Sequence, residues 1–386
     1  MIELSSLIKN LIKLFLYYLV EKFIWPNKII NEKTLLLIRM DAIGDYVLFQ
    51  DYIQFIRKSE KYKDYRITLV GNDLWREFEE LKMTSFIDEY IWINRKFFFR
   101  NLFYRLSILR RIASKGYEVI IQPTYSREYT VGDTIVKLTT ATHKIGHEGD
   151  FGNSSIRQKN KSDKFYTKLF KGSPDIMYEF DRNKEFFENV LSQTFQKQAL
   201  PKLPKYKQKK PLIDAKKYIV LFIGANSSYR CWGLQNYSLL AEHLRRSMKY
   251  SEHDIILCGS KAENEAAKWL TLNSSIPLIN MVGRTSLTEL THIVDKADLL
   301  VTNETSAHHI GVATNCSLVI VLYAGNHFGR FVPIIPHNNK YKAILHPKIL
   351  KDPEAYKTIS NTIGYHSNLN IDDIKVPDVT RVISYI

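Results

Sequence analysis

Two apolar segments from opposite halves of the chain constrain its fold most strongly. Residues 35–46 and 301–310 each begin with an apolar strand of the buried type, pass through a short polar loop and enter a helix. Open α/β sheets present their ligands at such strand ends. One copy in each half predicts an α/β chain with two facing Rossmann-like domains and a cleft between them.

The length supports this division, because 386 residues exceed what one hydrophobic core usually organises. After Pro26 the apolar pattern alternates between strand and helix. Strands are expected at 34–39, 65–70, 87–93, 118–122, 218–223, 254–258, 299–301 and 319–323. Helices are expected at 46–59, 74–81, 101–114, 126–138, 180–199, 236–249, 262–271, 287–297 and 307–313, and a long loop at 144–171.

Five segments follow from this pattern. Residues 1–30 form an amphipathic helix, 31–200 the first Rossmann-like domain, and 201–217 a linker rich in proline and lysine. Residues 218–368 form the second Rossmann-like domain. A C-terminal helix, 369–386, is expected to pack back on the first domain.

The charge favours anionic partners, since 55 Lys and Arg against 40 Asp and Glu give a formal net charge of +15. Nucleic acid, acidic lipid and phosphorylated substrates all fit that charge. No zinc-finger spacing, ribonucleoprotein motif or basic zipper is present, so no nucleic-acid partner is expected. The three widely spaced cysteines, Cys231, Cys258 and Cys316, favour a reducing compartment, and we expect a cytoplasmic protein.

The N-terminal segment is apolar but interrupted by charges. Its longest uncharged apolar run, 14–20, is far shorter than the about 20 residues that cross a bilayer, and no small-residue cleavage site follows. Two interpretations of this amphipathic helix remain open. It binds an anionic membrane surface, as a peripheral protein of the inner face would, or it packs on the protein's own body.

The first chemical motif is Asp41-Ala-Ile-Gly-Asp45, after the first strand. It lacks the three-glycine dinucleotide fingerprint. Gly44 permits a tight turn that places Asp45 at the mouth of the sheet, with Arg39 at the end of the strand. Asp45 is either an ordinary helix N-cap or a general base that accepts a proton from an incoming hydroxyl.

Two loops of the second half carry the other candidates. In the loop 224–232, Asn226, Ser227, Ser228 and Arg230 form either a diphosphate cradle or simple turn chemistry. In the loop 303–309, polar side chains suit a phosphate or sugar contact, and His327 and Arg330 follow further on. The members of this second loop are Asn303, Glu304, Thr305, Ser306 and His309. His308 and His309 are adjacent and point to different helix faces, so no metal site is expected.

These motifs carry a family resemblance. The order of 35–45, 224–232, 283–290 and 302–309, with the tail 371–383, resembles glycosyltransferase family nine, the ADP-heptose lipopolysaccharide heptosyltransferases, from about residue 34 onward. The resemblance implies a GT-B fold and metal-independent, inverting sugar transfer without a cofactor. It also implies a nucleotide-sugar donor held mainly by the C-terminal domain and an acceptor in the N-terminal domain.

Residue by residue, the resemblance makes Asp45 the catalytic base and places Arg230 where a lysine usually contacts the donor diphosphate. Glu304, Thr305, Ser306 and His309 occupy the family's Asp-Thr-Gly-x-x-His loop, and Glu263 corresponds to an acidic nucleotide contact. Glu304 replaces Asp and Ser306 replaces Gly, so the donor need not be ADP-heptose.

The expected function is therefore transfer of heptose or a similar sugar to a lipopolysaccharide-type or other surface glycan or glycolipid. Two alternatives remain: a nucleotide-sugar epimerase of the same fold, which needs no acceptor, and a non-catalytic basic protein that binds membrane or nucleic acid. The amphipathic N-terminus suits a lipid-linked acceptor.

Overall fold

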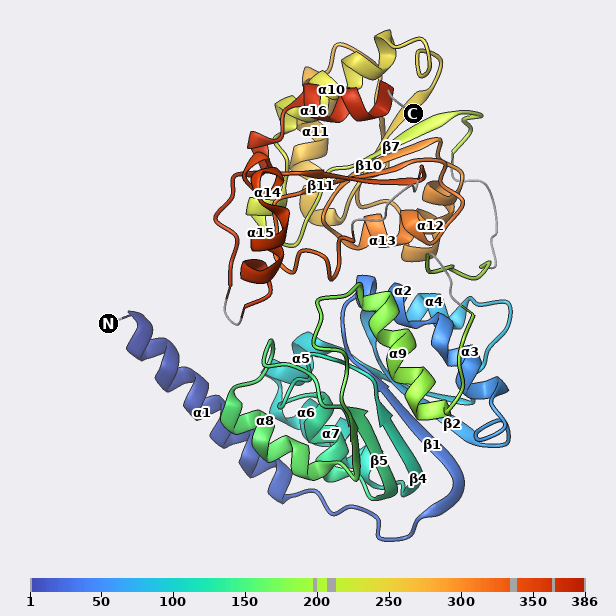
Figure 1. Ribbon diagram of the computed structural model, residues 1–386, viewed down its shortest axis with the longest axis vertical. Helices are drawn as coiled ribbons and strands as arrows, with labels where there is room; N and C mark the ends of the chain where they lie inside the picture. Colours follow the sequence, from blue (N-terminus) through green and yellow to red (C-terminus); the bar gives the residue numbers. More distant parts are fainter. Residues whose placement is uncertain (1, 197–199, 207–212, 334–338, 363–364, 385–386) are drawn as a thin grey trace.

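The computed structural model describes residues 2–196, 200–206, 213–333, 339–362 and 365–384, and contains two parallel six-stranded sheets. Their orders are β3-β2-β1-β4-β5-β6 and β12-β11-β10-β7-β8-β9. Counted from its own first strand, each sheet has the Rossmann order 3-2-1-4-5-6. Figure 1 shows one sheet in each lobe, so the prediction of two facing Rossmann-like domains is confirmed.

The first sheet is built from strands whose carboxyl ends share one edge. Its strands are β1 Asn31–Arg39, β2 Arg66–Asn72, β3 Glu89–Ile93, β4 Tyr117–Gln122, β5 Ala141–His147 and β6 Lys168–Phe170. The end of β1, from Leu35, is buried because both faces of a parallel sheet are covered by helices. The covering helices are α2 Ile43–Phe49, α3 Asp51–Lys58, α4 Arg76–Glu80, α5 Arg95–Arg100, α6 Leu102–Ala113, α7 Gly132–Leu138, α8 Ile156–Ser162 and α9 Glu179–Leu191.

The second sheet repeats this arrangement. Its strands are β7 Tyr218–Phe222, β8 Asp254–Cys258, β9 Ile279–Asn280, β10 Leu299–Asn303, β11 Val319–Tyr323 and β12 Tyr341–Leu345. All five residues of β7, β10 and β11 are buried, which makes these strands the centre of the sheet. The helices are α10 Leu234–Arg246, α11 Asn264–Asn273, α12 Leu287–Asp295, α13 Ser306–Val312, α14 Pro347–Lys351, α15 Pro353–Ser360 and α16 Val376–Ser384.

Several expected elements differ from the structure. The expected loop 144–171 contains β6, α8 and the end of β5, and α8 is set by a capping box in which Ser155 and Gln158 bond each other's backbone N–H groups. The expected helix 46–59 divides into α2 and α3 at Gln50, whose side chain donates to the carbonyl of Lys202. The short strand β9 and the edge strand β12 were not expected.

Helix contacts join the two lobes. Helix α2 packs on α13, and α4 packs on α12. Glu77 of α4 accepts hydrogen bonds from the Ser286 hydroxyl at 2.6 Å, the Leu287 backbone N–H at 2.9 Å and the Thr288 hydroxyl. These groups form the N-terminus of α12, whose own N-cap is Ser286, so Glu77 adds an acceptor from the other domain to that helix end.

The expected linker, 201–217, lies partly outside the described residues. Its described start is fixed to both lobes: the Lys202 N–H donates to Asp51 of α3 at 3.0 Å, and the Leu203 N–H donates to the carbonyl of Ala313 at 2.8 Å. Tyr206 stacks on Phe78 of α4. This part of the linker therefore packs along the contact between the lobes.

The two terminal helices belong to different lobes. Helix α1, Ile2–Lys22, packs on α6. Helix α16 packs on α10 and β12, and its Val379 and Ile383 join the apolar core of the second sheet. The expectation that the C-terminal helix packs on the first domain is wrong, because its apolar side fits the core of its own domain. Among the described residues, no helix is long and apolar enough to cross a membrane.

Candidate active site

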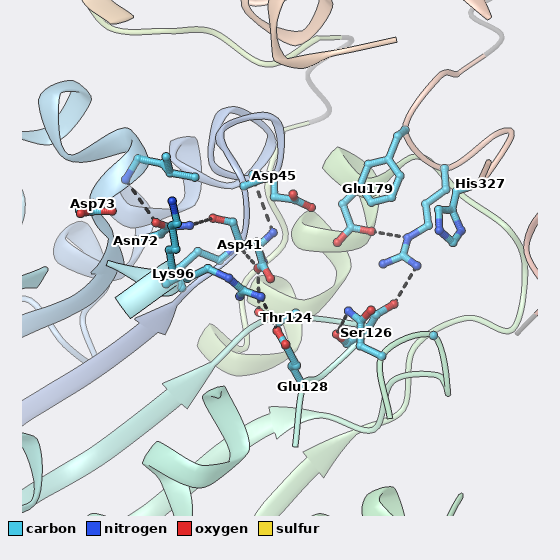
Figure 2. A pocket seen from close by; sticks show the side chains of 18 of the residues that line it. Asp41, Asp45, Asn72, Asp73, Lys96, Thr124, Ser126, Glu128, Glu179 and His327 are labelled. Atoms are coloured by element: carbon cyan, nitrogen blue, oxygen red, sulfur yellow. Dashed lines mark hydrogen bonds and ion pairs between the residues drawn. The ribbon is translucent and has the colours of Figure 1, made fainter. Parts of the chain in front are cut away.

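A cavity of about 670 Å³ lies at the carboxyl edge of the first sheet. Residues that directly follow β1, β2, β3 and β4 line it, as expected for a parallel sheet. The second lobe contributes three lining residues, His327, Arg330 and Phe331. Figure 2 shows Asp45, Asp41 and Glu179 on this cavity, with His327 at its side.

Asp45 lies in the first turn of α2 and lines the cavity. The N-cap of α2 is Ala42, so Asp45 is not the N-cap that one interpretation of the sequence proposed. The pKa of the Asp45 carboxyl is raised from 3.8 to about 7, mainly by burial and also by Asp41 and Glu179, against the opposing effect of Arg39 and Arg330. A carboxylate with such a pKa can accept a proton near neutral pH.

Asp41 is a second carboxylate on the same cavity, and its position is fixed. Its Oδ2 lies 2.9 Å from Nε of the buried Arg39 and accepts the Thr124 hydroxyl at 3.0 Å. The Asp41 carbonyl accepts the Asn72 amide and the Trp75 indole N–H. Arg39 therefore forms the floor of the site and holds Asp41 beside Asp45.

Arg330 reaches from the second lobe into the first. Its guanidinium donates to Glu179 at 2.9 Å, to the Ser126 hydroxyl at 2.8 Å and to Asp150 at 3.3 Å. The Glu179 N–H donates back to the Arg330 carbonyl at 2.9 Å. Burial lowers the pKa of Arg330, but Glu179 and Asp150 outweigh burial and raise it, so the side chain stays charged. The pair joins the lobes beside Asp45.

The loops of the second sheet form a separate cluster at its carboxyl edge. Arg230 Nη1 lies 3.6 Å from Glu304 Oε1, and burial raises the pKa of Glu304 to about 7 against the opposing effect of Arg230. Ser227 and Ser228 lie at the start of the short 3-10 helix Ser228–Arg230, and the neighbouring Asn226 is exposed. Arg230 and the two serines are thus partly or fully exposed, and Arg230 lies beside Glu304.

Two candidate residues in this cluster, Asn303 and Glu263, form hydrogen bonds with backbone groups. The Asn303 side chain accepts the Trp232 N–H at 3.1 Å and donates to the carbonyls of Ile223 and Gly224, so it ties the two loops together. Glu263 accepts the Ser260 N–H at 2.7 Å, beside Gly224. A Cβ on Gly224 would lie 2.6 Å from the Glu263 carboxyl carbon.

The loop before α13 faces α2 of the other lobe. Thr305 is the N-cap of α13, and Ser306 is its first residue. Burial, with the neighbouring His308, holds the pKa of His309 well below its usual range, so the ring is neutral. A Cβ on Gly44 would lie 2.5 Å from His309 Cδ2. Gly44 has no positive φ, so it allows close approach of α13 and does not form the tight turn that the sequence suggested.

The structure thus brings the candidates into two groups. Arg39, Asp45, His327 and Arg330 lie on the cavity, whereas Ser227, Ser228, Arg230, Glu263 and Glu304 do not line it. Within the described part of the chain, no group of three or more His, Cys, Asp and Glu side chains is arranged to hold a metal ion.

Several cavity residues were not predicted from the sequence. Asn72 ends β2, and Asp73, Asn94, Arg95, Lys96, Thr124 and Ser126 come shortly after β2, β3 and β4, so their position at strand ends was a usable signal. Glu179 and Asp150 had no such signal, because only the folded chain brings them to Arg330.

Fold and site together define a two-lobed α/β protein of the GT-B type, with facing strand edges and a carboxylate between them. The family model of glycosyltransferase family 9 (heptosyltransferase) matches residues 105–361, which is more than half of the chain. The chain therefore belongs to glycosyltransferase family 9 and is a glycosyltransferase.

Solved structures are similar across nearly the whole chain. A family 9 glycosyltransferase from Veillonella parvula DSM 2008 is 16% identical with a TM-score of 0.66, covering 92% of this chain and 97% of that one. E. coli heptosyltransferase WaaC with ADP-2-deoxy-2-fluoro heptose is 15% identical with a TM-score of 0.64, covering 91% and 99%. E. coli ADP-heptose lps heptosyltransferase II is 16% identical with a TM-score of 0.60, covering 91% and 98%. No curated protein sequence matches the chain.

Proposed function

We propose that this protein transfers a sugar from a nucleoside-diphosphate donor to a glycan or glycolipid acceptor, with inversion and without a metal. The observation that carries the proposal is Asp45, a cavity carboxylate whose pKa burial raises to about 7. The cavity of the first lobe receives the acceptor, and the loops of the second lobe hold the donor.

The chemical step is a single displacement. The acceptor hydroxyl oxygen attacks the anomeric carbon and its proton passes to Asp45, while the bond from that carbon to the diphosphate oxygen breaks. The electron pair leaves with the nucleoside diphosphate. Because attack comes from the face opposite the leaving group, the anomeric configuration inverts. Asp41, held by Arg39 and Thr124, favours the protonated form of Asp45 and so makes it a stronger base.

The donor diphosphate is held by Arg230 with the hydroxyls of Ser227 and Ser228. Arg230 lies beside Glu304, whose other carboxylate oxygen has no hydrogen-bond partner within the described residues. A bound diphosphate shares Arg230 with Glu304, and protonation of Glu304 relieves the repulsion between the two anions, since burial raises the pKa of Glu304 to about 7. Thr305, Ser306 and His309 then border the sugar, and Glu263 the nucleotide.

An ADP-linked heptose is the donor we propose first, and a lipopolysaccharide-type glycan the acceptor. The support for the donor is that the similar WaaC structure was solved with ADP-2-deoxy-2-fluoro heptose. The support for the acceptor is the similarity to ADP-heptose lps heptosyltransferase II. No cofactor takes part beyond the donor itself.

Helix α1 supports a place on the inner face of the cytoplasmic membrane. Tyr17, Val20 and Ile24 are buried against the protein, so one side of the segment packs on the first lobe. The other side leaves apolar residues exposed: Ile8, Leu11, Ile12, Phe15, Leu16, Tyr18, Leu19, Phe23 and Trp25. An apolar side with nearby lysines is the pattern of helices that lie in the membrane interface. The two interpretations of this helix are therefore compatible.

The test is a thermal-shift panel of ADP, UDP and GDP, followed by transfer assays with the preferred nucleotide sugar. A ligand that binds only the folded protein raises the melting temperature, and ADP is expected to raise it most. Arg230→Gln should abolish this shift, while Arg246→Gln, on an exposed helix side, should retain it. Isomerised donor in the absence of acceptor would indicate an epimerase. Salt-sensitive duplex binding with no response to any nucleotide would indicate a non-catalytic basic protein.

A further inference from the structure

The corner between α5 and α6 exposes large aromatic side chains next to the cavity. Phe97 is 56% exposed and Phe103 is 86% exposed. Asn94, Arg95 and Lys96, at the start of the same helix α5, line the cavity that contains Asp45. One short element therefore runs from the cavity rim to an exposed apolar surface.

The charged residues of this segment are all basic, although Arg95 pairs with Glu128 and Lys115 pairs with Glu89 from neighbouring segments. From Tyr90 to Tyr117 the sequence contains no Asp or Glu, whereas its cations are Arg95, Lys96, Arg100, Arg105, Arg110, Arg111 and Lys115. Lys96, Arg100, Arg110 and Arg111 are exposed. Lys96 and Arg100 lie on the same helix as Phe97, and Arg110 lies beside the exposed Trp25 at the end of the α1 segment. Exposed rings together with exposed cations match an anionic phospholipid surface, which offers phosphates to the cations and hydrocarbon to the rings.

Helix α1 is fixed to this corner. The Tyr17 hydroxyl donates to the Phe99 carbonyl at 2.8 Å, and Lys13 Nζ lies 4.7 Å from the centre of the Phe99 ring. The Arg105 guanidinium lies 3.9 Å from the centre of the Tyr17 ring. Figure 1 shows α1 along the side of the first lobe that carries α5 and α6, with its N-terminus extending beyond them.

We propose that the α5–α6 corner and the exposed side of α1 form one docking surface for an anionic phospholipid bilayer, which sets the mouth of the Asp45 cavity at the level of the lipid headgroups. This proposal rests on the proposed function, because a lipid-linked acceptor needs its glycan presented to that cavity. In this proposal α1 attaches the protein to the bilayer. Phe97 and Phe103 make a second contact with the bilayer, which fixes the orientation of the protein on it.

The test uses the full chain and sedimentation with vesicles of equimolar phosphatidylglycerol and phosphatidylcholine. The variant Phe97→Ser/Phe103→Ser is compared with the control Met248→Ser/Leu272→Ser, which removes two apolar side chains of the second lobe that are 101% and 84% exposed. We expect vesicle affinity to fall at least about tenfold in the first variant and to stay unchanged in the control. Even partial loss of the free energy gained when the two rings enter the bilayer costs that much. Arg100→Gln should weaken binding at low salt more than at high salt.

Two readouts separate this proposal from the proposed function. Phe97→Ser/Phe103→Ser should keep the nucleotide-induced thermal shift and the transfer rate to a delipidated, soluble glycan, and should lose rate only on acceptor embedded in vesicles. Equal vesicle binding by this variant and the wild type would overturn the docking surface. So would a change in its oligomeric state with vesicle binding unaltered, because a second copy of the chain would then cover the corner. Wild-type vesicle binding without any sugar transfer would instead overturn the proposed function alone.

Discussion

Replacing Asp45 with Asn should stabilise the protein while abolishing its activity. Because burial raises the pKa of Asp45 from 3.8 to about 7, the folded chain binds this proton more tightly than the unfolded chain. The unfolded chain releases the proton first as the pH rises, so stability falls between about pH 4 and about pH 7 and the full cost remains above that range.

The size of the cost follows from the shift. About three pKa units correspond to about 4 kcal/mol at about 1.4 kcal/mol per unit, but Asp45 is open to the cavity, and water there reduces the figure. We therefore expect Asp45→Asn to be more stable than wild type by about 1–2 kcal/mol at pH 8, with the difference shrinking towards pH 4. Urea unfolding at several pH values measures this directly.

The same variant tests catalysis. Loss of a general base should lower kcat about 10²–10⁴-fold, while the thermal shift caused by nucleotide stays close to that of wild type. Asp64→Asn, an exposed carboxylate of the same lobe, is the control and should change neither stability nor turnover. Normal turnover in Asp45→Asn would remove Asp45 from the mechanism, and a destabilised variant would refute the assigned cost of burial.

Three further results are expected. In wild type, kcat/KM should fall about tenfold per pH unit below about pH 7, as Asp45 becomes protonated; a flat profile down to pH 5 would contradict this. Arg330→Leu should lower the free energy of unfolding by about 3–5 kcal/mol, since it leaves Glu179, 2% exposed, without its partner. It should also move the acid limb of the rate profile to higher pH, and Glu179→Gln in the same chain should recover part of the stability. Glu77→Ala should cost about 1–2 kcal/mol because the Leu287 N–H and the Ser286 and Thr288 hydroxyls lose their acceptor, while the Ser286–Glu289 capping box of α12 remains. The exposed Glu80→Ala should cost little, and equal effects would argue against a stabilising contact of Glu77 with α12.

The sequence predicted the two sheets because buried parallel strands are continuous apolar runs. The strands 254–258 and 319–323 were placed at their observed bounds for that reason. Edge elements such as β6, β9 and β12 carry weaker apolar runs, and they were missed or taken for loop.

The site residues that could be predicted from the sequence are those that lie close to the end of a strand. Asp45 lies in the first turn of α2, the helix that follows β1, so its place at the sheet edge could be inferred from the motif alone. The pairing of Arg330 with Glu179 joins residues 151 positions apart, and no periodicity encodes such a contact. Gly44 shows the same limit: its need for a glycine comes from His309 of the other lobe and not from local backbone conformation.

The contacts that Arg330 makes across the cleft have a consequence for the exchange of lobes between related enzymes. The carboxylate and hydroxyl partners of Arg330 lie on the other lobe, so an incoming second lobe without an arginine at position 330 breaks this set of contacts even when both halves keep their own cores intact. A hybrid that inherits Glu179 and Asp150 without an arginine at position 330 carries surplus negative charge beside its base. When a second lobe is exchanged to change donor preference, the hybrid must therefore keep an arginine at position 330, because this side chain is part of the active site of the first lobe.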